Sequence, residues 1–161
     1  MRLGSVHLVR PKVLAVFLIL LAFAQAKAAE PLAGTWRLKS QNVGGQSVGF
    51  EPLTLRITPS GRGFEFAYSV PVNNIQFVSM RYLSGLDGTE ADVKDPQGAK
   101  IGSIKISKAS PLQYNVTMQG VNRPTVSGKL TVSADRKTLT SDSNANLPGR
   151  GETRTVQIFS R

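Results

Sequence analysis

The sequence predicts an all-β protein that folds as a single antiparallel, up-and-down β-barrel of about 8–10 strands. Short runs of alternating apolar and polar residues recur from residue 34 to the end of the chain, at a spacing of roughly 8–12 residues. Clusters of Gly, Pro, Asn and Asp separate these runs, and helical periodicity is almost absent. A barrel is preferred to a sandwich because short hairpins join consecutive strands and because closure removes exposed edges.

The first 28 residues have the layout of a secretory signal peptide. A basic head containing Arg2 and Arg10 precedes an apolar run of 11 residues, 13–23, and small-x-small cleavage sites end at Ala26 and Ala28. The run is too short for a membrane-spanning helix, which needs roughly 20 residues. We therefore expect residues 1–28 to be removed after Ala26 or Ala28. Residues 29–161 then form one exported domain, periplasmic or secreted, with no stable membrane anchor.

Composition excludes several kinds of chemistry. The full chain has a net charge of +10, but four of its 20 basic residues lie in the signal segment, which leaves 16 against 10 acidic residues and a charge of +6. The chain has no cysteine, and its one histidine, His7, leaves with the signal. Disulfides, thiol chemistry and His-based triads are thereby excluded. We expect no enzyme activity, no metal or other cofactor, and no nucleic-acid partner, since no basic run is interleaved with aromatics.

The first strand is expected over residues 35–43. Gly34 lets the chain turn tightly into it, and Trp36 and Leu38 share one face. Trp36 is the only tryptophan of the chain and is large enough to close one end of a barrel interior.

Nine further strands follow from the same alternation, with turns between them. They are expected over residues 53–58, 64–70, 75–83, 91–94, 100–107, 112–118, 126–132, 137–143 and 153–160. For residues 75–83 two inward faces stay open, one that contains Phe77 and one that contains Met80 and Tyr82. Around Gly102 the apolar spacing changes from odd to even, which predicts a β-bulge.

Three short motifs carry a family resemblance. Residues 34–38, Gly-Thr-Trp-Arg-Leu, resemble the opening motif of the lipocalin and calycin superfamily and of avidin-like barrels. The Asp87-Gly88 pair, residues 132–140 and the aromatic end of the last strand are similar to small exported bacterial lipocalin-like proteins of unassigned function. Arg136 stands where that pattern has glycine. Because arginine is costly at positive φ, we expect this turn to adopt another conformation.

The resemblance implies a structural group that closes the barrel. In lipocalins an arginine near the last strand packs across the motif tryptophan, so Arg154 is expected over Trp36, with Gly34 at the entry to the strand. Such stacking contributes on the order of 0.5–2 kcal/mol.

The resemblance also implies binding of a small hydrophobic or amphipathic ligand inside the barrel. Two alternatives stay open: a hollow barrel that encloses such a ligand, and a barrel filled with its own side chains. The residues expected to line such a site are Trp36, Phe64, Phe66, Tyr68, Phe77, Tyr114 and Met118. The alternative is an envelope protein that binds another protein or an anionic surface without an interior ligand. In either case we expect a monomer. Metalloprotease inhibitors of bacteria resemble such barrels but usually carry a disulfide.

Overall fold

The computed structural model describes residues 29–61, 63–149 and 151–161, and all of its regular secondary structure is β. The predicted signal peptide lies outside these residues. Within them, no helix is long and apolar enough to cross a membrane. The strands are β1 (Gly34–Val43), β2 (Gln46–Ser47), β3 (Thr54–Ser60), β4 (Gly63–Val72), β5 (Ile75–Ser84), β6 (Asp87–Lys94), β7 (Lys100–Ser110), β8 (Gln113–Gly120), β9 (Thr125–Val132), β10 (Thr138–Leu147) and β11 (Gly151–Ser160).

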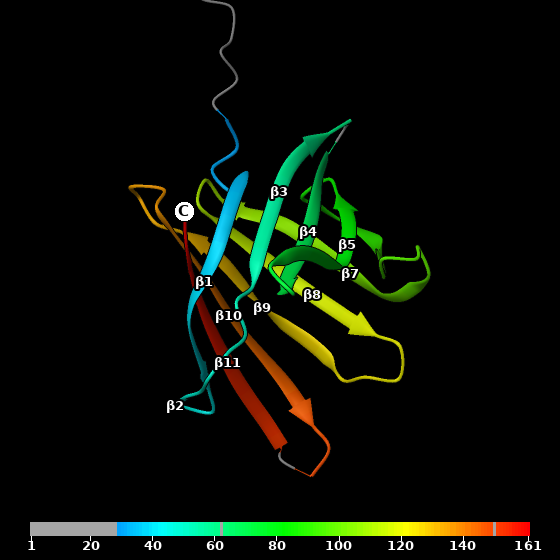
Figure 1. Cartoon of the computed structure of the whole chain (residues 1–161), viewed down its shortest axis with the longest axis vertical. Coiled ribbons are helices and arrows are strands. Elements are labelled where there is room, and N and C mark those ends of the chain that lie inside the picture. The colour runs from blue at the N-terminus through cyan, green and yellow to red at the C-terminus, as the bar shows by residue number, and fades with distance from the viewer. Residues whose placement is uncertain (1–28, 62, 150) are drawn as a thin grey trace, which may run out of the picture.

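Ten of these strands close into one barrel. From β3 to β11 each strand pairs with the next along the chain, β1 pairs with β3, and β11 pairs with β1 to complete the circle. Every pairing is antiparallel, and β2 is a short addition at the edge of β1. Figure 1 shows β8 to β11 running side by side, with β1 next to the C-terminal strand. The predicted up-and-down antiparallel barrel is confirmed.

The weakest part of the wall is the seam between β5 and β6. Only one residue pair, Arg81 with Lys94, joins these two strands, whereas β10 and β11 are paired along their length. The barrel is therefore closed by hydrogen bonds everywhere except along most of this seam.

A bulge in β5 explains why its inward face was ambiguous. Tyr68 of β4 pairs with Met80, but the next residue, Ser69, pairs with Val78, so Ser79 is an extra residue in β5. Before the bulge Phe77 lies on the inner side of the sheet, and after it Met80 and Tyr82 do. Neither of the two expected faces runs the whole strand, because one inserted residue exchanges the two faces. The register shift expected near Gly102 is also present, at the neighbouring Ile101.

The closed end of the barrel is built around Trp36. Its side chain is fully buried together with those of Leu32, Leu139 and Phe159. The indole Nε1 donates a hydrogen bond to the carbonyl of Leu32 at 2.9 Å, which holds the segment before β1 across the barrel floor. Glu30, in the same segment, accepts hydrogen bonds from the Tyr114 hydroxyl and from Lys108.

The arginine over Trp36 is Arg161, so the expectation for Arg154 is wrong. The Arg161 guanidinium lies 4.2 Å from the centre of the indole ring. Its Nη2 donates to the carbonyls of Pro31 at 2.7 Å and Ala33 at 2.6 Å. Arg154 lies seven residues earlier, roughly 24 Å away along an extended strand, on the outer face. There it pairs with Asp142 at 2.6 Å.

The expectation for the Arg136 turn is also wrong. Arg136 has a φ of 58°, so the turn keeps the left-handed conformation that glycine would adopt. Side-chain hydrogen bonds hold the turn in place. The Asp135 carboxylate accepts from the Lys137 amide at 3.0 Å, and the Ser133 hydroxyl accepts from the Thr138 amide at 2.9 Å. These bonds offset the steric cost of a side chain at positive φ.

Candidate functional site

A cavity of about 260 Å³ lies inside the barrel, above the packed floor. One wall is apolar and comes from strands β4, β5, β7, β8 and β9. The main side chains of this apolar wall are Tyr68, Met80, Tyr82, Ile104, Met118 and Leu130. They point inward because they occupy alternate positions of their strands, and the strand bulge in β5 brings Met80 into the set.

The opposite wall of the cavity is polar. It is formed by Ser141 and Ser143 of β10 and Gln157 of β11. Ser79, on the β5 side of the cavity, donates its hydroxyl to the Tyr68 carbonyl at 3.2 Å. Ser141 and Gln157 are directly paired across the two strands. The Gln157 Nε2 donates to Oε1 of Gln41 in β1 at 3.1 Å. The interior therefore has two chemically different sides.

Tyrosines connect the cavity with the packed core. The Tyr82 ring stacks on Phe66, with ring centres 4.8 Å apart and planes 15° from parallel, and Tyr68 lies 6.3 Å from Tyr82. Burial raises the pKa of Tyr68, and burial followed by the neighbouring Tyr68 raises the pKa of Tyr82 well above its ordinary value. Both phenols are therefore neutral at physiological pH.

The structure separates the predicted ligand-binding residues into distinct places. Tyr68 and Met118 line the interior cavity. Trp36, Phe66 and Tyr114 are fully buried in the packed core. Burial, followed by the hydrogen bond to Glu30, raises the pKa of Tyr114, so its neutral form is favoured there.

Two predicted residues lie away from this cavity. Phe64 lines a separate surface hollow near the barrel floor, together with Leu86 and Lys108. Phe77 is half exposed, at 50%, close to the end of the β4–β5 hairpin. A role in ligand binding stays a prediction for all seven residues.

Sequence reasoning missed the polar side of the cavity. Ser141, Ser143 and Gln157 occupy positions that alternate in phase with the buried Leu139 and Phe159. Polar residues usually lie on the solvent side of a strand, so residue type alone does not mark these three as part of an interior site. The parity with Leu139 and Phe159 was the available signal, since alternate residues of a strand share one face.

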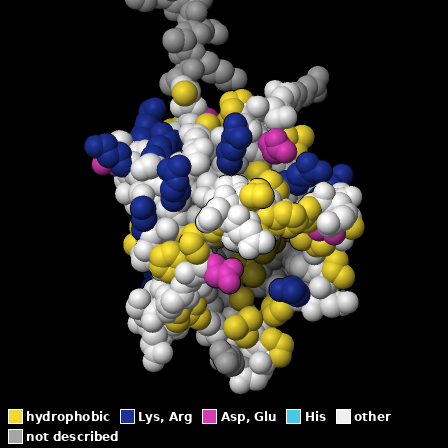
Figure 2. Space-filling model, viewed as in Figure 1, with side chains coloured by type: hydrophobic (Ala, Val, Ile, Leu, Met, Phe, Trp, Pro, Cys, Tyr) yellow, Lys and Arg dark blue, Asp and Glu magenta, His cyan; other side chains and the backbone are white. Residues whose placement is uncertain are grey.

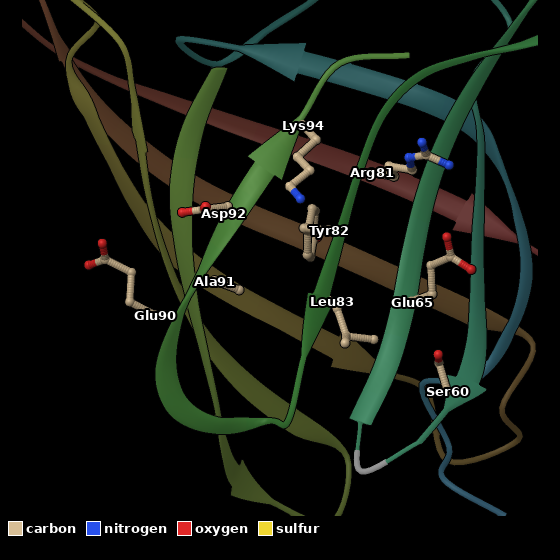
Figure 3. A pocket seen from close by; sticks show the side chains of 9 residues that line it. All are labelled: Ser60, Glu65, Arg81, Tyr82, Leu83, Glu90, Ala91, Asp92 and Lys94. Carbon is tan, nitrogen blue, oxygen red and sulfur yellow. The ribbon is translucent and has the colours of Figure 1, made fainter. Parts of the chain in front are cut away.

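A second cavity, of about 470 Å³, follows the seam between β5 and β6. Figure 3 shows Tyr82 between the two strands, with Arg81 of β5 and Lys94 of β6 on either side of the gap. Glu90 and Asp92 project from β6 away from Tyr82 in that view, and they pair with Lys105 at 3.3 Å and Lys100 at 2.6 Å. This hollow lies on the outer wall and is lined mainly by charged and polar side chains, so the interior cavity is the better candidate site for an apolar molecule.

Apolar side chains surround the open end of the barrel. Strands β4, β8 and β10 end there, opposite the floor formed by Trp36. Exposed hydrophobic residues in or next to the connections at this end are Phe50, Val72, Ile75, Phe77, Ile101 and Val121. In Figure 2 hydrophobic side chains also lie at the lower end of the molecule, while most Lys and Arg side chains gather in the upper part. An apolar mouth favours entry of an apolar molecule over entry of an ion.

Among the described residues, no three His, Cys, Asp or Glu side chains come close enough to hold a metal ion. Glu90 and Asp92 are engaged with lysines, as described above.

Comparisons with known proteins support the fold. The crystal structure of the zebrafish ileal bile acid-binding protein, in complex with cholic acid, matches with a TM-score of 0.53. The match has 18% sequence identity and covers 81% of this chain and 98% of that one. At this identity the similarity shows that the two chains share a β-barrel fold and nothing finer. A scan against protein families and a search of curated proteins find no match.

Proposed function

We propose that this protein binds a small hydrophobic or amphipathic molecule inside its barrel. The observation that carries the proposal is the interior cavity of about 260 Å³, with Tyr68, Met80 and Met118 on its apolar side. Ligand sites in proteins are concave, mostly apolar and of roughly 300–1,000 Å³, so this cavity suits a small or slender ligand. The structural neighbour, a bile acid-binding protein in complex with cholic acid, is consistent with this use of the barrel. That the chain is not an enzyme stays a prediction.

The proposal is tested by filling the cavity. A lipophilic fluorescent dye should bind saturably to the wild-type protein. Met118→Phe and Met118→Trp place progressively larger side chains in the cavity and should weaken dye binding by at least about tenfold for the larger one. Thr117→Trp is the matched control. Thr117 is the adjacent residue and lines an outer hollow with Glu90 and Lys105, so dye binding should be unchanged.

Circular dichroism and the urea midpoint establish that each variant is folded before binding is compared. If the wild type binds no dye, or if Thr117→Trp weakens binding as much as Met118→Trp, the interior is not the site. Intrinsic fluorescence is a poor substitute for the dye, because Trp36 is buried in the floor and does not line the cavity.

Export to the periplasm or the medium is part of the proposal. It rests on the signal-like layout of residues 1–28. Cleavage after either Ala26 or Ala28 keeps Glu30 and Leu32, which both contact the barrel floor. Expression of the full chain with fractionation of the cells, followed by intact-mass measurement, should give a protein that begins at Lys27 or Ala29. Recovery of only the full-length chain from the cytoplasm would reject export.

Basic residues on the outer face favour a second candidate function, binding of an anionic surface. Arg37 and Arg56 lie close together on β1 and β3, since Thr35 pairs with Arg56 and Arg37 with Thr54. Both are exposed, and neither forms an ion pair within the described residues. Sedimentation with anionic vesicles at low and high salt tests this function. Arg37→Gln/Arg56→Gln should lose a salt-sensitive association, and equal sedimentation with neutral vesicles would argue against it.

A further inference from the structure

The cavity surface carries no charged side chain within the described part of the chain. Lys129 is the one charged residue among those that line the cavity, and strand alternation turns its side chain away from the interior. Its strand neighbours Gly128 and Leu130 face inward, so Lys129, between them, faces outward. There Lys129 pairs across the sheet with Asp142, which is ion-paired with Arg154.

Near the barrel floor, the charged residues Lys108 and Glu30 form an ion pair with each other. Lys108 binds the Glu30 carboxylate at 2.8 Å, beside Tyr114 and outside the cavity lining. Tyr68 and Tyr82 line the cavity with phenols whose pKa values are raised by burial, so they supply no negative charge at physiological pH. An ionised ligand group in the cavity would therefore meet no opposite charge on the side chains that line it.

Neutral hydrogen-bonding groups, in contrast, are concentrated on one side. Gln157 uses one side-chain amide proton on Gln41, which leaves its second amide proton and its carbonyl oxygen for other partners. The hydroxyls of Ser141 and Ser143 lie on the neighbouring strand. This side can donate to and accept from hydroxyl, ester or amide groups, and the opposite apolar wall fits a hydrocarbon face.

Desolvation decides which ligands this interior accepts. Burying a carboxylate without a counter-charge is far more costly than burying a hydroxyl that keeps a hydrogen bond. We infer that the ligand is an uncharged amphipathic molecule, with its hydroxyl, ester or amide groups against Ser141, Ser143 and Gln157 and its hydrocarbon against the apolar wall. This inference rests on the proposed function and narrows the class of molecule that it concerns.

The test compares two probes that differ only in their head group, decanol and decanoate, by displacement of the lipophilic dye at about pH 8. The acid is fully ionised there, because carboxyl groups titrate near pH 4–5. Decanol should bind, and decanoate should bind at least about 100-fold more weakly. At about pH 4, where much of the acid is protonated, the difference should shrink.

Variants at Gln157 locate the polar contact. Gln157→Leu should weaken decanol binding about tenfold and leave binding of decane, which has no polar group, unchanged. Gln157→Arg supplies a cation and should raise the affinity for decanoate at pH 8 by at least tenfold. Gln97→Leu is the matched control, since Gln97 is exposed in the turn between β6 and β7 and should affect neither probe.

The outcomes separate the two proposals. If the dye and both probes fail to bind, the proposed function falls and this inference with it. If the dye binds but decanoate competes as well as decanol, the interior tolerates charge and only the inference is overturned. If decanol is preferred but Gln157→Leu binds it normally, the polar contact has been placed on the wrong residues and the inference is likewise overturned.

Discussion

At the scale of single residues, Arg161 is the cation that holds the barrel floor. It stacks on Trp36 and binds two backbone carbonyls of the segment before β1. Arg161→Ala should lower the free energy of unfolding by about 1–2 kcal/mol, measured by urea unfolding with Trp36 fluorescence as the signal. Arg154→Ala removes only an exposed ion pair and should change it far less. Equal effects of the two variants would contradict this assignment.

Gly34, which lies next to Arg161 at the barrel floor, is required there for two reasons. Its φ is 145°, a conformation that other residues rarely adopt, and a Cβ there would lie 3.1 Å from Nε of Arg161. Gly34→Ala should therefore destabilise the protein by roughly 1–3 kcal/mol in the same urea experiment. Gly49→Ala is the control, because Gly49 has no positive φ and nothing lies within 4 Å of a Cβ there. A stable Gly34→Ala protein would show that the floor tolerates the change.

At the scale of an element, the backbone of the β9–β10 hairpin is strained at Arg136, and a substitution can relieve this strain. Because the φ of 58° suits glycine, Arg136→Gly should raise the free energy of unfolding by about 0.5–1 kcal/mol. Lys137→Gly, at the next position and without positive φ, should lower it instead, since glycine gains no conformational relief there. The two urea midpoints should move in opposite directions. A lower midpoint for Arg136→Gly would mean that the arginine side chain stabilises the turn more than its φ costs.

At the scale of the whole molecule, all three tyrosines of the chain make the fold sensitive to alkali. The pKa values of Tyr68, Tyr82 and Tyr114 are raised, with burial as the main cause in each. The folded state thus holds their protons more tightly than the unfolded state, whose tyrosines titrate near pH 10. This contribution to stability is complete below about pH 10 and is lost as the pH rises above it.

The urea midpoint should accordingly fall steeply above about pH 10, and tyrosinate absorbance should appear together with unfolding. Tyr68→Phe removes one of the three groups and should make the alkaline loss shallower. Tyrosinate absorbance that rises near pH 10 while the protein stays folded would show that the phenols are not held in their neutral form.

Local sequence patterns were sufficient to predict much of the fold. Alternation at Trp36 and Leu38, and turn residues between the runs, predicted the strands, because side-chain period and turn chemistry are properties of neighbouring residues. The register within β5 was beyond such reasoning. The extra residue at Ser79 depends on how β5 pairs with β4, and nothing in residues 75–83 alone favours that pairing.

The sequence by itself determined the antiparallel barrel, the buried tryptophan and the absence of cysteine and histidine chemistry from residues 29–161. The tertiary structure decided which arginine reaches Trp36 and which residues face the cavity. The sequence alone allows either Arg154 or Arg161 to stack on Trp36. Arg161 does so, because Arg154 lies on the outer face of β11 and farther from the floor. Likewise Gln41 and Gln157 are 116 residues apart and meet only because β1 and β11 close the barrel. Such contacts depend on long-range pairing, and no local pattern encodes them.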